Sequence, residues 1–168
     1  MRLLPSLFVL LAAAAAPARE VLREVVHPKA DLPAFHCLLP ADWRSEVDAS
    51  GNLQLSNRDR TANFSLSLVH GSDPAGSLDV LAKAILAGAV TPPWNSREPA
   101  EISGHRGFRY SARVRHTNGV TVRAEVILVA VGDGHIAACS LLLSERVSRD
   151  DEATARLVHA AVKLLPAP

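Results

Sequence analysis

The sequence predicts an α+β fold in which a meander-like antiparallel β-sheet packs against two helices. Three observations support this prediction. Short segments with an apolar–polar period of two come first, a stretch with helical spacing follows, and longer apolar segments then precede a second helical stripe. Turn-forming residues separate the strand-like segments at hairpin distances, which favours antiparallel neighbours. Strands grouped beside segregated helices are typical of the α+β class.

The first half of the chain contains strand-like segments at residues 34–39, 43–47, 52–56 and 63–69. Pro40 ends the first segment because it has no backbone donor. The Ala-Ser-Gly sequence at residues 49–51 is a turn signal that joins the second and third segments as a hairpin. In the fourth segment Phe64, Leu66 and Leu68 alternate with serine, which predicts one buried face and one wet or lightly covered face.

The pattern then changes to helical spacing. Asp73, Pro74 and Ser77 supply the chemistry of a helix start. The apolar residues behind them predict an amphipathic helix of about three turns. These residues are Leu78, Leu81, Ala82, Ile85, Leu86 and Ala89. We expect the helix to end near Gly88, because the Pro92-Pro93 sequence cannot continue it.

The second half begins with a strand-like segment at residues 100–114 that has a break at Gly104 or Gly107. Thr117-Asn118-Gly119 predicts a tight hairpin, because Asn-Gly tolerates the positive φ that such turns need. The next segment, residues 120–131, is apolar on both faces over its second half. A run of this kind predicts a central strand that is covered on both sides.

The last part of the chain predicts one more strand and the second helix. Gly132-Asp133-Gly134 turns the chain back into a strand-like segment at residues 135–143. Ser148 is followed three residues later by Asp151, which resembles a capping box with aspartate in place of the usual glutamate. Apolar residues at helical spacing follow this start and predict a helix that runs up to Pro166.

The first eighteen residues have the pattern of a secretory signal peptide. Met1-Arg2 is a short positive end, and Ala16-Pro17-Ala18 is a small-x-small cleavage signal. The apolar run between them has about 14 residues where a bilayer span needs roughly 20. No cysteine follows the run closely enough to accept a lipid. We therefore expect a soluble exported protein without a stable membrane anchor, and the Ala- and Arg-rich composition favours a bacterial periplasm.

Cleavage would leave a polar or weakly ordered lead-in at residues 19–33 and a single domain at residues 34–166. The whole sequence has 18 Lys and Arg and 17 Asp and Glu, so removal of Arg2 gives 17 against 17. A neutral chain argues against a nucleic-acid partner and against an anionic membrane surface, because both require a basic face.

Cys37 and Cys139 are the two cysteines of the chain, and export would allow a disulfide between them. A bridge requires Cα atoms about 4.4–6.8 Å apart. We therefore expect it if the first strand lies beside the strand at residues 135–143. The alternative is two buried thiols that pack as small apolar groups. The chain has no Cys-x-x-Cys pair, which argues against thiol–disulfide catalysis.

The order of these segments and their residue content give the chain a distinctive layout. The residues that carry it are Phe35 to Trp43, Gly51 to Leu55, 63–69, Ser77 to Leu86, Glu101 to Tyr110, the hairpin around Gly132–Gly134 and the terminal helix. This layout, over about residues 34–166, resembles the PsbP/Mog1 superfamily and its small exported bacterial members. The resemblance implies an antiparallel sheet between helices, an α/β/α sandwich. It implies no catalytic residues, since members act mostly as binding or assembly modules, and their partners differ too much to be transferred.

The sequence contains no pattern that predicts an active site. Its seven histidines lack the spacing of metal ligands, and no Cys–His cluster has zinc spacing. A Gly-x-Ser-x-Gly nucleophile elbow is missing. The glycine- and serine-rich stretch at residues 71–77 lacks the lysine of a phosphate loop. We therefore expect a protein that is not an enzyme and that has no cofactor and no metal.

Trp94 is a candidate anchor for a partner, because it follows two prolines in a stiff loop; the alternative is that it folds back over the sheet. Our first hypothesis is a non-enzymatic periplasmic module that binds an unidentified protein partner or assists assembly. The alternative is a small-molecule carrier or, less favoured, a hydrolase, with a pocket between sheet and helix. A cavity in which several of His105, Tyr110, Arg123 and His135 converge would favour that alternative.

Overall fold

A computed structural model describes residues 22–29, 32–115, 119–132 and 134–166. The expected signal peptide at residues 1–18 and the turn residues Asn118 and Asp133 lie outside the described residues. The elements in chain order are β1 (Leu22–Lys29), β2 (Leu32–Pro40), β3 (Arg44–Val47), β4 (Leu53–Ser56), β5 (Ala62–His70), α1 (Pro74–Ile85), β6 (Ser96–Ile102), β7 (His105–Arg115), β8 (Thr121–Ala130), β9 (His135–Ser144), α2 (Arg149–Ala160) and β10 (Lys163–Leu165).

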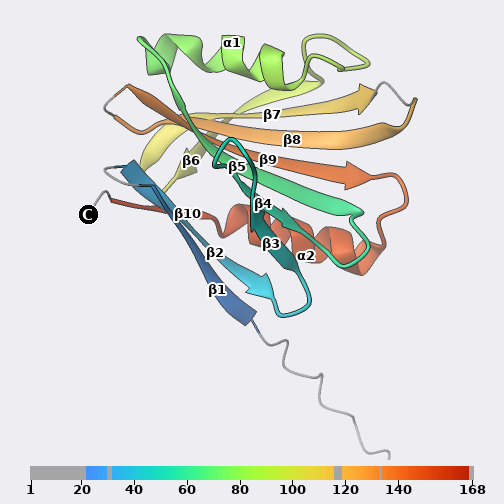
Figure 1. The fold of residues 1–168 in the computed structure, drawn as a ribbon. Coiled ribbons are helices and arrows are strands. Elements are labelled where there is room, and N and C mark those ends of the chain that lie inside the picture. The colour runs from blue at the N-terminus through green and yellow to red at the C-terminus, as the bar shows by residue number, and fades with distance from the viewer. Residues whose placement is uncertain (1–21, 30–31, 116–118, 133, 167–168) are drawn as a thin grey trace, which may run out of the picture.

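The strands form a main sheet and a small sheet, and all of their pairings are antiparallel. The main sheet has the order β3-β4-β5-β9-β8-β7-β6, and the small sheet has the order β1-β2-β10. Figure 1 shows α1 on one face of the main sheet, and α2 with the small sheet on the opposite face. The predicted α+β fold, with an antiparallel sheet between two helices, is confirmed.

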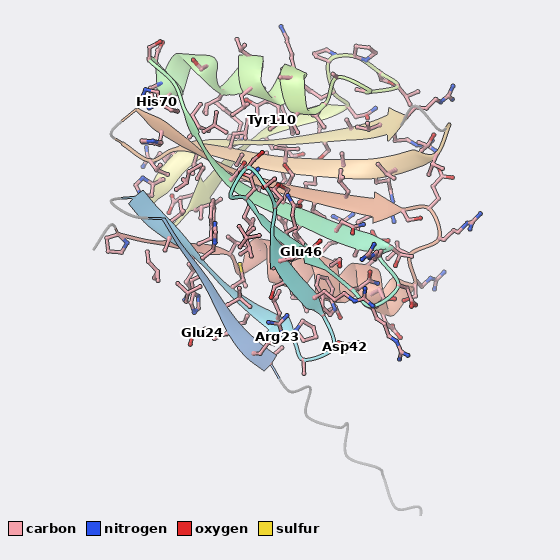
Figure 2. The ribbon with its side chains drawn as sticks, viewed as in Figure 1. Arg23, Glu24, Asp42, Glu46, His70 and Tyr110 are labelled. Atoms are coloured by element: carbon pink, nitrogen blue, oxygen red, sulfur yellow. The ribbon has the colours of Figure 1, made fainter. Side chains whose placement is uncertain are left out.

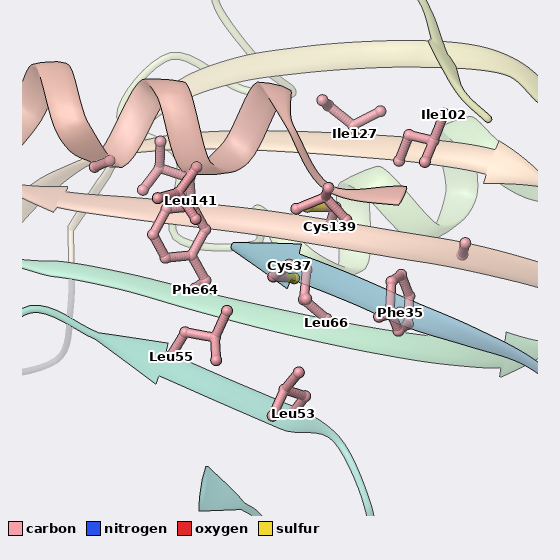
Figure 3. Packing of buried hydrophobic residues seen from close by; sticks show 14 of the residues in the cluster. Phe35, Cys37, Leu53, Leu55, Phe64, Leu66, Ile102, Ile127, Cys139 and Leu141 are labelled. Carbon is pink, nitrogen blue, oxygen red and sulfur yellow. The ribbon is translucent and has the colours of Figure 1, made fainter. Parts of the chain in front are cut away.

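Two apolar layers hold the structure together, one on each face of the main sheet. Val126 and Leu128 of β8 are buried in the layer under α1, whereas Ile127 and Val129 are buried in the layer facing α2 and the small sheet. This two-sided burial confirms the central strand predicted from the apolar run. Figure 3 shows the second layer, where side chains of β2 meet those of β4, β5 and β9.

The lead-in expected over residues 19–33 is wrong for most of its length, because Leu22–Lys29 is the strand β1. It pairs with β2, and its side chains also reach the edge of the main sheet. Arg23 donates hydrogen bonds to the carbonyl oxygen of Trp43 at 2.6 Å and to Ser45 Oγ at 3.1 Å. These partners are about twenty residues away in the chain, so the local polarity of the segment gave no sign of them.

The second helix also ends earlier than the apolar stripe predicted. It stops at Ala160, and Lys163–Leu165 forms β10 beside β2. Leu164 is buried opposite Phe35, and its backbone N–H donates to Ser103 Oγ at 2.9 Å. A strand of three residues forms only because of partners far away in the sequence. Its apolar residues also fit helical spacing, which is why the sequence predicted a longer helix.

The helix starts follow the predicted caps. The Asp73 carboxylate accepts from the Gly76 N–H at 3.0 Å, and Ser148 Oγ accepts from the Asp151 N–H at 3.0 Å. The break between β6 and β7 lies at Gly104, whose φ of +85° favours glycine. Each helix has 12 residues, and within the described part of the chain neither is long and apolar enough to cross a membrane.

Candidate binding groove

An open groove of about 660 Å³ lies on the α1 face of the main sheet, where the first turn of α1 leaves the β6–β7 hairpin uncovered. Its lining is dominated by apolar and small residues. The lining residues are Ala75, Leu78, Pro99, Ala100, Glu101, Arg106, Gly107, Phe108 and Ala130. The volume falls within the range of about 300–1,000 Å³ typical of ligand pockets. We call this feature the α1 groove.

Among the described residues that line the α1 groove, two are charged, Glu101 and Arg106, and they are register partners on β6 and β7. Both side chains are exposed, and neither forms a hydrogen bond or an ion pair with another described residue. Pro99 removes one backbone donor from β6, the outermost strand of the main sheet. Charges and a proline on an edge strand oppose pairing with another strand, so the groove favours apolar contact over β-strand addition.

One wall of the groove is fixed by an arginine. The guanidinium carbon of Arg97 lies 3.3 Å from the centre of the Phe108 ring, and Arg97 Nε donates to Asp79 Oδ1 at 3.0 Å. Stacking on an aromatic face combined with an ion pair restricts the rotamers of both side chains. Phe108 is therefore held in place where it lines the groove.

Tyr110 lies beneath α1, as Figure 2 shows, and ties that helix to the main sheet. Its hydroxyl donates to Asp79 Oδ1 at 2.5 Å. This hydrogen bond is the largest of the causes that lower the pKa of the Asp79 carboxyl, and burial raises the pKa of Tyr110 to about 12. Tyr110 is thus a neutral donor that positions α1, and it does not line the groove.

Trp94 packs against the sheet. Its ring meets Tyr110 edge-on with ring centres 4.8 Å apart, and it is half-buried in the layer under α1. This is the arrangement in which the tryptophan folds back over the sheet. Its role as a partner anchor stays a prediction.

The four residues named for the pocket alternative are not brought together. Tyr110 is covered by α1. Arg123 forms a bidentate ion pair with Glu152 on the α2 side. His135, at the start of β9, contacts His70 at the end of β5. His105 begins β7, and none of the four lines the α1 groove. The residues that line the α1 groove were not predicted, because they depend on the position of α1 along the sheet.

A polar cluster around the buried His159 on the α2 side was also missed by sequence reasoning. His159 of α2 is buried, with Nδ1 at 3.0 Å from Glu125 Oε1 and Nε2 at 3.2 Å from the Cys139 carbonyl oxygen. A carboxylate and a carbonyl only accept hydrogen bonds, so a hydrogen bond between His159 and either of them has the imidazole as its donor. Arg109 at 3.5 Å and Arg156 at 3.2 Å also face Glu125.

This cluster has the composition of a Cys–His–Glu catalytic triad but not its geometry. Nε2 of His159 bonds to the backbone oxygen of Cys139 instead of activating its sulfur. Burial also raises the pKa of Cys139 well above its ordinary value, which opposes formation of a thiolate. The hydrogen bond from His159 lowers the pKa of Glu125. The arrangement therefore fixes α2 on the sheet and has no reactive group to offer a substrate.

No protein-family profile matches the chain, and no relative was found among curated proteins. Solved structures do match. CyanoP, the cyanobacterial PsbP protein of Synechocystis sp. PCC 6803, is 12% identical with a TM-score of 0.56, over 92% of this chain and 98% of CyanoP. LpqN of Mycobacterium tuberculosis, described as involved in cell envelope biogenesis, is 17% identical with a TM-score of 0.56, over 86% of this chain and 92% of LpqN. The chain has a PsbP/Mog1-like fold.

Two further matches are more distant in structure. The Ran-binding protein Mog1p of Saccharomyces cerevisiae is 14% identical with a TM-score of 0.49, over 89% of this chain and 87% of Mog1p. A structure from Bacteroides thetaiotaomicron VPI-5482 is 19% identical with a TM-score of 0.48, and this chain spans only 44% of its length. Identities this low leave partner and activity open.

Within this PsbP/Mog1-like fold, both cysteines are free and buried. Cys37 lies on β2 of the small sheet and Cys139 on β9 of the main sheet. We expected a bridge if these two strands were neighbours in one sheet, and they are not. The two side chains belong to one apolar layer, seen in Figure 3. The disulfide between them stays a prediction.

We expect both thiols of the reduced, native protein to be unreactive toward Ellman's reagent. Burial raises the pKa of Cys37 to about 12 and that of Cys139 well above its ordinary value, and only the thiolate reacts. Rapid reaction of either thiol without unfolding would contradict this expectation. Alkylation of the unfolded, unreduced exported protein then tests the disulfide. Modification of both cysteines would show that they are not bridged and serve only as small apolar groups in the core.

Among the described residues, no group of three or more His, Cys, Asp or Glu side chains is placed to hold a metal ion. The α1 groove offers no nucleophile with a positioned base. Its chemistry is that of a binding surface with an apolar floor and two unpaired charges at its edge.

Proposed function

We propose that the protein is a non-enzymatic, exported binding module whose α1 groove receives an apolar group of a protein partner. The observation that carries the proposal is the groove itself, where Phe108 and Leu78 stand beside small residues that leave space open. The described envelope role of LpqN, a protein of the same fold, fits an exported module. The apolar signal-like segment at residues 1–18 supports export to the periplasm.

Filling the groove tests this proposal. Ala75→Trp places a bulky ring at an exposed position that lines the groove, and Ala84→Trp places the same ring at an exposed position of α1 outside it. We expect a protein captured by the mature domain from periplasmic extract to be lost with Ala75→Trp and retained with Ala84→Trp. Equal capture by both variants would place the partner surface elsewhere.

A second candidate function is a small-molecule carrier, which the volume of the groove favours. Native mass spectrometry of protein purified from the periplasm distinguishes the two candidates. A small apolar molecule that is bound by the wild type and by Ala84→Trp, and absent from Ala75→Trp, would support the carrier. A wild-type spectrum that shows only the protein mass would leave the protein-binding module as the better account.

A further inference from the structure

The ends of β5 and β9 bring two histidines together that are 65 residues apart in the sequence. His70 and His135 are register partners, and their rings lie edge to face with centres 5.1 Å apart. The Gly71 N–H donates to the Gly134 carbonyl oxygen at 2.7 Å, so the backbone fixes the two strand ends relative to each other. His70, labelled in Figure 2, is exposed, and His135 is half-buried.

One nitrogen of this pair has no partner in the structure. His135 Nδ1 is buried and has no hydrogen-bond partner among the described residues. Buried polar atoms in native proteins are nearly always bonded, and an unbonded one calls for a water molecule or an ion. His70 makes no side-chain hydrogen bond with a described residue either, so both imidazoles are available as ligands.

The spacing of the rings fits a shared metal ion. A metal about 2.0–2.1 Å from an imidazole nitrogen lies about 3.2 Å from the ring centre, so two imidazoles bound at a square or tetrahedral angle have centres about 4.5–5.2 Å apart. The observed 5.1 Å falls in this range. The ring planes are inclined by 65°, which is also the inclination of an edge-to-face aromatic contact, so it is the unbonded nitrogen together with the spacing that indicates a metal.

We propose that His70 and His135 form a two-imidazole site for a divalent late transition-metal ion such as Cu²⁺ or Zn²⁺, with water in the remaining positions. Imidazole nitrogen suits these ions, whereas Ca²⁺ and Mg²⁺ need oxygen ligands that no described carboxylate supplies here. The exposure of His70 gives the ion access from solvent and leaves room for water ligands. The site is separate from the α1 groove, because neither histidine lines it.

Copper titration of the mature protein tests the site. We expect one equivalent of Cu²⁺ to bind at mildly alkaline pH, with two nitrogen ligands in the electron paramagnetic resonance spectrum, and Zn²⁺ to compete for it. His70→Gln and His135→Gln should each weaken binding about tenfold or more. Binding should also weaken in acid, because imidazole must be deprotonated to coordinate.

His105→Gln is the matched control, because His105 is also half-exposed at a strand start but has no histidine opposite it. Its copper affinity should equal that of the wild type. The proposal is overturned if the wild type shows no saturable binding, or if the control loses as much affinity as the two ligand variants. A spectrum of the unmutated protein without two nitrogen ligands would also overturn the proposal, and that outcome does not depend on any variant being folded.

Discussion

Replacing Glu125 by alanine is expected to lower the free energy of unfolding by about 1–3 kcal/mol, because it leaves Nδ1 of the buried His159 without its hydrogen-bond partner. His159 loses its Nδ1 acceptor inside the layer beneath α2, and Arg156 loses an ion pair at 3.2 Å. Denaturant unfolding of the wild type and the variant measures the difference. The matched control is Glu145→Ala, which removes an exposed ion pair with Arg113 and should have a much smaller effect.

The same substitution should change the response to acid. The hydrogen bond from His159 lowers the pKa of Glu125 in the folded protein. A carboxyl of this kind contributes stability above its ordinary pKa, and that contribution is lost as the pH falls through the lowered value. The difference between wild type and Glu125→Ala should therefore shrink in acid. A difference that stays constant from neutral pH into acid would show that the carboxylate is not the stabilising form.

Gly107→Ala is expected to destabilise the protein by about 3 kcal/mol, the upper end of the usual cost of overpacking. A Cβ at position 107 would lie only 1.9 Å from the Leu128 carbonyl oxygen, so β7 and β8 could not keep their present separation. The obstructing atoms belong to the backbone, which cannot rotate away as a side chain can. Thermal and denaturant unfolding measure the effect.

Gly71→Ala serves as the control for Gly107→Ala, since a Cβ at position 71 would meet no atom within 4 Å. We expect its stability to stay close to that of the wild type. If both variants were equally stable, the close approach of β7 and β8 would not be a constraint on the fold. The comparison also bears on the α1 groove, because Gly107 lines it and its small size is part of why the groove is open.

Local sequence patterns were sufficient for most of the main sheet. The alternation in β5 and the two-sided apolar run in β8 indicate burial directly, because every second side chain of a strand points to the same face of the sheet. The helix starts at Asp73 and Ser148 could be predicted for the same reason, since a cap acts on backbone groups two or three residues away.

The parts that could not be predicted depend on partners far away in the chain. The strands β1 and β10 form because each of them pairs with one edge of β2. The contact between His159 and Glu125 spans 34 residues, and that between His70 and His135 requires the register of β5 against β9. The α1 groove depends on where a helix lies along a sheet, which hydrophobic spacing along the chain does not encode.

The small sheet determines how the protein can be tethered. Both ends of the described chain belong to it, because β1 and β10 flank β2. This sheet covers the face of the main sheet opposite α1, as Figure 1 shows. A support, label or fused domain joined at either end is therefore attached on the far side from the α1 groove. The groove would face outward from any surface that holds the protein by its ends.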